Sequence, residues 1–142
     1  MGQVPKDLSQ VIAPSLDITQ FLLLNREALL GSGSVTGTGF AFAFVVPAGE
    51  LWYVHSFTVT GPAILAGDRL RVSVGIALNG GYFQQSESSP TINTVNDRVG
   101  VGFRNPVWIG PGTALGVFTE AYTSGGGGFS MGYAAAITRL RV

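Results

Sequence analysis

Side chains that could act as nucleophile, base or metal ligand are few in this chain, and their spacing does not favour catalysis. The sequence contains no Cys and one His, His55. A Ser/His/Asp arrangement would need that imidazole as its base. His55 lies between Val54 and Ser56 in a stretch typical of a β-strand. We therefore expect a half-buried, hydrogen-bonded histidine and no enzymatic activity.

The acidic residues do not form a recognisable metal or acid/base motif. Asp68, Glu87 and Asp97 could bind calcium, but they lack the dense Asp/Asn/Gly spacing of a calcium loop. One His cannot supply the two or three imidazoles of a cupin-type centre. Glu50 and Glu120 are candidates for a carboxylate pair, which would also need a cleft with aromatic platforms. The simpler interpretation is solvated charges at strand ends, and we expect no metal and no cofactor.

Two glycine-rich segments superficially resemble phosphate-binding loops. Residues 31–39 lack the GK[ST] ending that binds phosphate and magnesium, and residues 125–128 contain no Lys. Both segments are better explained as turns that need positive φ. We expect Gly31–Ser34 to be a flexible joint between elements.

Charged residues are unusually scarce. They make up 11% of the 142 residues, against about 25% in a typical soluble protein. Eight acidic and eight basic residues cancel, which argues against nucleic-acid binding, because that needs a basic surface. Seven of the eight basic residues are Arg, the cation better suited to protein interfaces. We expect a self-associating protein, with a two-fold dimer favoured over a trimer.

No membrane or export signal is evident in the sequence. The longest apolar run, Phe40–Pro47, is far shorter than the roughly 20 residues that span a bilayer. The segment Met1–Leu16 lacks the basic start and apolar stretch of a signal peptide. We expect no membrane partner, and synthesis and assembly in the cytoplasm.

The chain divides into an extended N-terminal arm, residues 1–15, and a single domain, residues 16–142. Pro5 and Pro14 prevent a regular helix or central strand in the arm. Four apolar side chains of the arm would be exposed to water if the arm were a solvated tail. These are the candidate partner-binding residues: Val4, Leu8, Val11 and Ile12. We expect the arm to lie on a neighbouring molecule, to be dispensable for folding of the domain and to be needed for attachment to the partner.

From Val35 onward, short alternating segments separated by Gly, Pro and Asn predict seven to nine strands. Such a pattern is typical of an antiparallel β-sandwich or barrel, and no βαβ spacing is present. Residues 16–30 are ambiguous. A strand at Phe21–Leu24 is favoured, and the alternative is a short helix capped by Asp17 or Thr19.

Period-two alternation predicts which residues form the core. Within residues 51–60, it places Trp52 and Val54 on one face and Phe57 and Val59 on the other. The predicted core consists of Phe40, Phe42, Phe44, Trp52, Val54, Leu70, Val72, Val74, Trp108, Leu115, Val117, Met131 and Tyr133.

Two stretches carry a family resemblance. Residues 45–54, VVPAGELWYV, resemble the VPAGxxW strand-turn-strand of small β-sandwich proteins in tailed-phage virions. Residues 107–117, VWIGPGTALGV, are similar to a later hairpin of the same proteins. Together they resemble capsid decoration (cement) proteins with a jelly-roll body, over about residues 35–142 and without the arm.

The resemblance implies a jelly-roll sandwich that binds the major capsid protein on the outer capsid surface and stabilises the shell. No family catalytic residue exists to be carried over. Because a Pro-x-Gly turn before an aromatic strand also suits tail-fibre and lectin domains, the alternative is a carbohydrate- or receptor-binding module of a phage tail or fibre. In that case Tyr82, Phe83 and Trp108 would be its stacking platforms.

Overall fold

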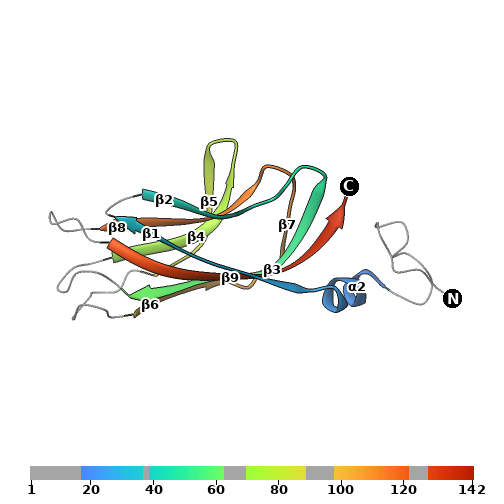
Figure 1. Cartoon of the computed structure of the whole chain (residues 1–142), viewed down its shortest axis with the longest axis horizontal. Helices are drawn as coiled ribbons and strands as arrows, with labels where there is room; N and C mark the ends of the chain where they lie inside the picture. The colour runs from blue at the N-terminus through green and yellow to red at the C-terminus, as the bar shows by residue number, and fades with distance from the viewer. Residues whose placement is uncertain (1–16, 37–38, 63–69, 89–97, 122–127) are drawn as a thin grey trace.

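Antiparallel strands in two packed sheets make up most of the protein. The computed structural model describes residues 17–36, 39–62, 70–88, 98–121 and 128–142 (Figure 1). The first sheet has the strand order β1-β9-β3-β6, with β7 also paired to β3. The second sheet has the order β2-β8-β4-β5. The predicted all-β antiparallel sandwich is therefore confirmed.

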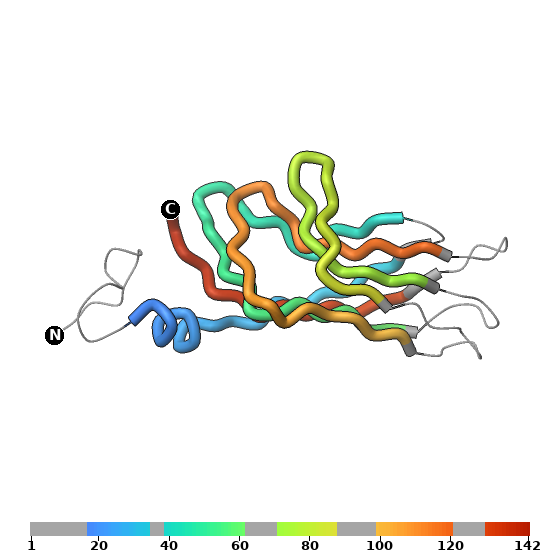
Figure 2. Tube along the Cα trace, turned by 180° about the vertical axis from the view of Figure 1, so that it is seen from behind, coloured from blue at the N-terminus to red at the C-terminus, as the bar shows by residue number. Residues whose placement is uncertain are grey.

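One short helix precedes the strands. The helix is α2 (Ile18–Leu24), and the strands are β1 (Glu27–Thr36), β2 (Gly39–Val45), β3 (Glu50–Pro62), β4 (Leu70–Leu78), β5 (Gly81–Ser88), β6 (Arg98–Phe103), β7 (Val107–Ile109), β8 (Ala114–Ala121) and β9 (Gly128–Arg141). The β4–β5 hairpin projects from the body, on the side away from α2 (Figure 2).

The turn of this hairpin is set by its sequence. Asn79 and Gly80 are its two connecting residues, and their φ angles are 51° and 77°. Positive φ at both positions matches the twist of the flanking strands, and Asn-Gly is the dipeptide that adopts it most readily. The Asn-Gly dipeptide therefore accounts for the tight connection between β4 and β5.

The core lies between the sheets and is almost entirely aliphatic and aromatic. Seven residues predicted for it are buried: Trp52, Val54, Val72, Val74, Leu115, Val117 and Met131. Phe44 and Tyr133 are partly buried against this cluster, and their rings meet edge to face at 5.3 Å between centroids. The side chain of Leu70 lies outside the described residues.

The predicted burial of Phe40 and Phe42 is wrong. Phe40 is 49% exposed and Phe42 is 62% exposed, whereas Ala41 and Ala43 pack against the core. Both faces of β2 are apolar, so alternation could not determine which face is buried. A register shift between Phe42 and Phe44 then turns Phe44 inward.

A second bulge explains a second error. The register between β3 and β9 shifts between Val54 and Ser56. Trp52 and Val54 before the bulge, and Phe57 and Val59 after it, therefore all face the core. The sequence had placed the two pairs on opposite faces.

Trp108 was also expected in the core, but it is 42% exposed. It lies opposite Tyr53 on the outer face of the first sheet, where the two rings meet at 4.8 Å. Its neighbour Ile109 takes the inward position in the three-residue strand β7.

The N-terminal part of the domain also differs from expectation. Residues 18–24 form a helix instead of the favoured strand, because the Asp17 carboxylate accepts a hydrogen bond from the Gln20 backbone N–H at 2.8 Å. Phe21 and Leu22 pack against Leu140 on the outer face of the first sheet. The predicted joint at Gly31–Ser34 is wrong too, since these residues belong to β1 and pair with β9.

The two phenylalanines Phe57 and Phe42 test this assignment of faces. Phe57 is fully buried, so Phe57→Ala should lower the free energy of unfolding by about 3–5 kcal/mol. Phe42→Ala should lower it by about 1 kcal/mol at most, because most of that ring already contacts water. Urea denaturation of both variants measures the difference, and similar losses would show that β2 has been assigned the wrong face.

Candidate functional site

The outer face of the second sheet carries a cluster of aromatic rings, which we call the aromatic face: Phe40 and Phe42 from β2, Tyr82 from β5 and Phe118 from β8. The Phe40 ring lies 4.9 Å from the Tyr82 ring and 5.0 Å from the Phe118 ring, between centroids. The Phe40 and Phe42 rings are stacked at 6.5 Å. These rings form one continuous apolar surface instead of scattered exposed residues.

Two glycines beneath Tyr82 allow its ring to lie close against the sheet. Gly116 of β8 pairs with Gly75 of β4 on one side and with Phe42 of β2 on the other. A Cβ atom at Gly75 would lie 2.9 Å from the Tyr82 ring and would also collide with the Phe83 carbonyl. Glycine inside a strand here permits the close approach of the ring.

Tyr82 is held in place by its hydroxyl. That oxygen lies 3.0 Å from the hydroxyl of Ser73, which points outward from β4 but is fully buried. Burial raises the pKa of Tyr82 above its ordinary value of 10.0. The ring is thus fixed by a hydrogen bond as well as by packing.

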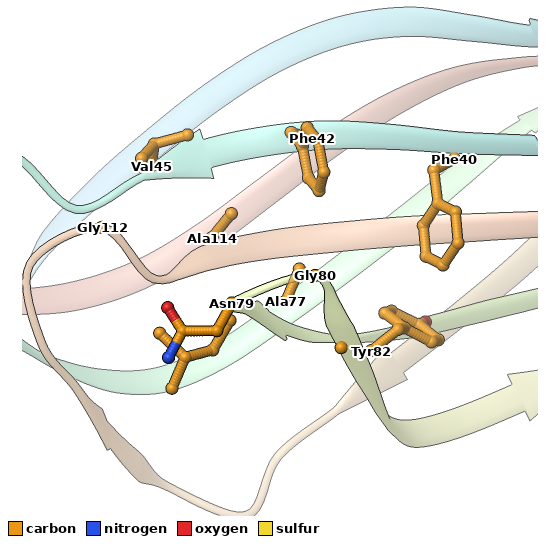
Figure 3. Close-up of a pocket in the computed structure, with 11 residues that line it drawn as sticks. Phe40, Phe42, Val45, Ala77, Asn79, Gly80, Tyr82, Gly112 and Ala114 are labelled. Atoms are coloured by element: carbon orange, nitrogen blue, oxygen red, sulfur yellow. The ribbon is translucent and has the colours of Figure 1, made fainter.

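An open groove of about 320 Å³ runs along the aromatic face (Figure 3). Phe40 and Phe42 of β2 lie on one side of the groove, and Tyr82 lies across from Phe40. Ala114 lies on β8, the strand between β2 and β4. The turn at Asn79 borders the groove near its other end. No lining side chain is charged among the residues described, and Asn79 supplies the one amide.

Charges gather on a neighbouring part of the same face. Arg71 donates hydrogen bonds to Glu87 at 2.8 Å, to Glu120 at 3.3 Å and to Gln84 at 3.2 Å. The hydrogen bonds from Arg71 and Gln84 hold the pKa of the Glu87 carboxyl below its usual range. These exposed ion pairs contribute little stability, but they separate the apolar groove from a polar neighbouring surface.

His55 is half-buried and hydrogen-bonded, as the sequence predicted. Its Nε2 lies 2.9 Å from the Thr138 hydroxyl, which itself donates to the Leu22 carbonyl oxygen at 2.6 Å. Thr138 therefore accepts from His55, which fixes the proton on Nε2, and the chain of bonds fastens α2 to the first sheet. Burial lowers the pKa of His55 below 6.5, and the charge of Arg26 acts in the same direction.

The carboxylates considered for catalysis or metal binding are not assembled into a site. Glu50 accepts a hydrogen bond from Trp52 Nε1 at 2.6 Å in the first sheet, whereas Glu120 belongs to the second. Glu87 is paired with Arg71, and Asp68 and Asp97 lie outside the described residues. Within the described ranges, no group of three His, Asp or Glu side chains could hold a metal ion.

The residues predicted to bind a partner or a carbohydrate lie in different parts of the molecule. Val4, Leu8, Val11 and Ile12 of the arm lie outside the described residues. Tyr82 belongs to the aromatic face, and Trp108 lies against Tyr53 on the other sheet. Phe83 follows Tyr82 directly in β5 and is 58% exposed. The structure therefore does not bring Tyr82 and Trp108 onto one platform.

Sequence reasoning missed the aromatic face because it assigned Phe40 and Phe42 to the core. One signal was available. Gly75 and Gly116 interrupt two strands that are otherwise rich in β-branched and bulky residues, and such glycines mark the close approach of another group.

Comparison with known proteins adds no family. No protein-family model matches the chain, and no curated protein matches it in sequence. In the part of the chain that the structure describes, no helix has the length and apolar character to cross a membrane.

Tyr82 provides a test of the anchoring at this site. Tyr82→Phe removes the partner of a buried hydroxyl, so it should cost about 1–3 kcal/mol of unfolding free energy at pH 7. Since the folded-state pKa is raised, the stabilisation by protonated Tyr82 is complete below pH 10 and is lost as the pH rises above it. Denaturation at pH 7 and above pH 10 should show the gap between wild type and variant narrowing. A gap independent of pH would contradict burial of the Tyr82 hydroxyl, and an unchanged free energy of unfolding in Tyr82→Phe at pH 7 would contradict the anchoring role.

Proposed function

We propose that this chain is a structural virion protein, a decoration (cement) subunit with a jelly-roll body that binds the major capsid protein and stabilises the shell. The single observation that carries the proposal is the aromatic face, whose groove has no charged lining side chain, on the outside of the sandwich. Its location would be the capsid surface, after assembly in the host cytoplasm.

The strand pairing supports the jelly-roll assignment. Paired from the two ends of the chain inward, β1 lies beside β9, β2 beside β8, β3 beside β6 and β7, and β4 beside β5. Such nested pairing is expected of a long hairpin rolled into two four-stranded layers, which is the architecture of many viral capsid and lectin domains. The pairing is compatible with both the decoration role and the alternative binding module.

The chemistry of the aromatic face supports a protein partner over a carbohydrate. Protein interfaces are enriched in aromatic residues and depleted of charge at their centres. Seven aliphatic or aromatic side chains surround a single amide, that of Asn79, in the groove: Phe40, Phe42, Val45, Ala77, Leu78, Tyr82 and Ala114. Sugar recognition needs several fixed polar groups beside a stacking ring. The single amide side chain of Asn79 does not provide enough hydrogen-bonding groups for it.

Binding to purified particles tests the proposal. We expect the purified chain to co-sediment with shells assembled without it, and Phe42→Ser to weaken binding by about 30-fold, as for an interface hot spot worth about 2 kcal/mol. Leu30→Ser is the matched control, because Leu30 is an equally apolar side chain, 77% exposed, on β1 of the first sheet. This control should leave binding unchanged.

Two outcomes would overturn the proposal. The first is absence of binding to shells at micromolar concentration. The second is binding of defined glycans on an array with loss of that binding in Phe42→Ser, which would favour the carbohydrate-binding alternative.

A further inference from the structure

We propose that the groove of the aromatic face binds the N-terminal segment, residues 1–16, of a second copy of this chain. The inference rests on the proposed function only in treating the aromatic face as a protein interface. It adds the identity of one occupant and makes self-association a head-to-tail contact instead of the two-fold dimer expected from the sequence.

The chemistry of the segment fits the groove. Five large aliphatic residues recur along it, Val4, Leu8, Val11, Ile12 and Leu16. Its two charged side chains, Lys6 and Asp7, are adjacent and opposite in sign. The groove presents aromatic rings and no charged side chain. Aliphatic side chains on an extended strand can insert between such rings without leaving a charge desolvated.

The backbone of the segment suits an extended binding mode. From the sequence, we expect Pro5 and Pro14 to disfavour a helix and to favour β or polyproline conformation at the residues before them. Sixteen residues precede Asp17, and at roughly 3.3 Å per residue they can extend about 50 Å. Such a length exceeds the width of a small sandwich, so a neighbouring molecule is within reach.

The starting point of the segment favours a neighbour over its own groove. It leads into α2, which packs through Phe21 and Leu22 on the outer face of the first sheet. Thr138 fastens the helix there through the Leu22 carbonyl oxygen. The groove is on the outer face of the second sheet, so the two lie on opposite layers of the sandwich (Figure 1). To reach its own groove, the segment would have to pass around the domain from the outer face of the first sheet to that of the second, which would use part of its reach of about 50 Å.

An interface of this kind is heterologous, because the segment of one copy meets the groove of the next. Repetition of the contact gives a ring or an open chain of subunits. A protein that braces many joints on a shell gains from such links, since each bound copy raises the local concentration of the next arm.

Disulfide trapping between two single variants tests the inference, and the natural absence of Cys makes it clean. Full-length Leu8→Cys and Phe42→Cys proteins are mixed without particles under mild oxidation. We expect the mixed disulfide to form at least about tenfold faster than between Leu8→Cys and Leu30→Cys, because a bound arm has an effective concentration near millimolar. Leu30 is the control because it is highly exposed and lies on the other sheet.

Two results would overturn the inference. Equal rates for the Phe42 and Leu30 partners would mean that the arm has no preference for the groove. Rapid closure of a monomeric disulfide in the double variant Leu8→Cys/Phe42→Cys at low concentration would mean that each arm lies in its own groove. The trapping experiment contains no shells, so it can fail independently of the proposed function. If Leu8→Cys shows no preference for Phe42→Cys while Phe42→Ser still weakens binding to shells, only the inference about the arm is overturned.

Discussion

The pairing of β9 with β3 is the interaction on which the rest of the structure depends. It extends from the Glu50–Arg141 pair to the Thr60–Gly132 pair, and it places β1 on one side and β6 with β7 on the other. Both strands turn one face toward β4 and β8 and bury it. The outer faces must then be covered separately. Within the described residues, α2 covers part of the first sheet, and no helix covers the second.

The exposed rings of the aromatic face can gain free energy by being buried against a partner. Burying a phenylalanine side chain contributes roughly 2–3 kcal/mol. Phe40 and Phe42 do not gain this free energy in the isolated domain, because they remain exposed. The hydrogen bond between the Tyr82 hydroxyl and buried Ser73 holds the Tyr82 ring, which lies beside Phe40, in one position. Because little order has to be gained on binding, a fixed ring surface contributes more affinity than a mobile one.

Most strands and turns could be predicted from the sequence, whereas the faces of some strands could not. The inward positions of β4 and β9, such as Val72 and Met131, followed from simple alternation. Bulges near Ala43 and His55 reversed the alternation, and no local residue pattern announces them. The helix of residues 18–24 is too short to be identified from hydrophobic periodicity. It is stabilised at its N-terminus by the Asp17 cap. The groove was beyond prediction because it joins β2, β5 and β8 through long-range pairing.

A cryo-electron microscopy map of the proposed particle is the most direct test of the role of the aromatic face. We expect each copy to turn the outer face of its β2-β8-β4-β5 sheet toward other protein, with Phe40 and Phe42 buried at the contact. A map in which those rings face solvent, while the outer face of the β1-β9-β3-β6 sheet makes the contacts, would contradict it.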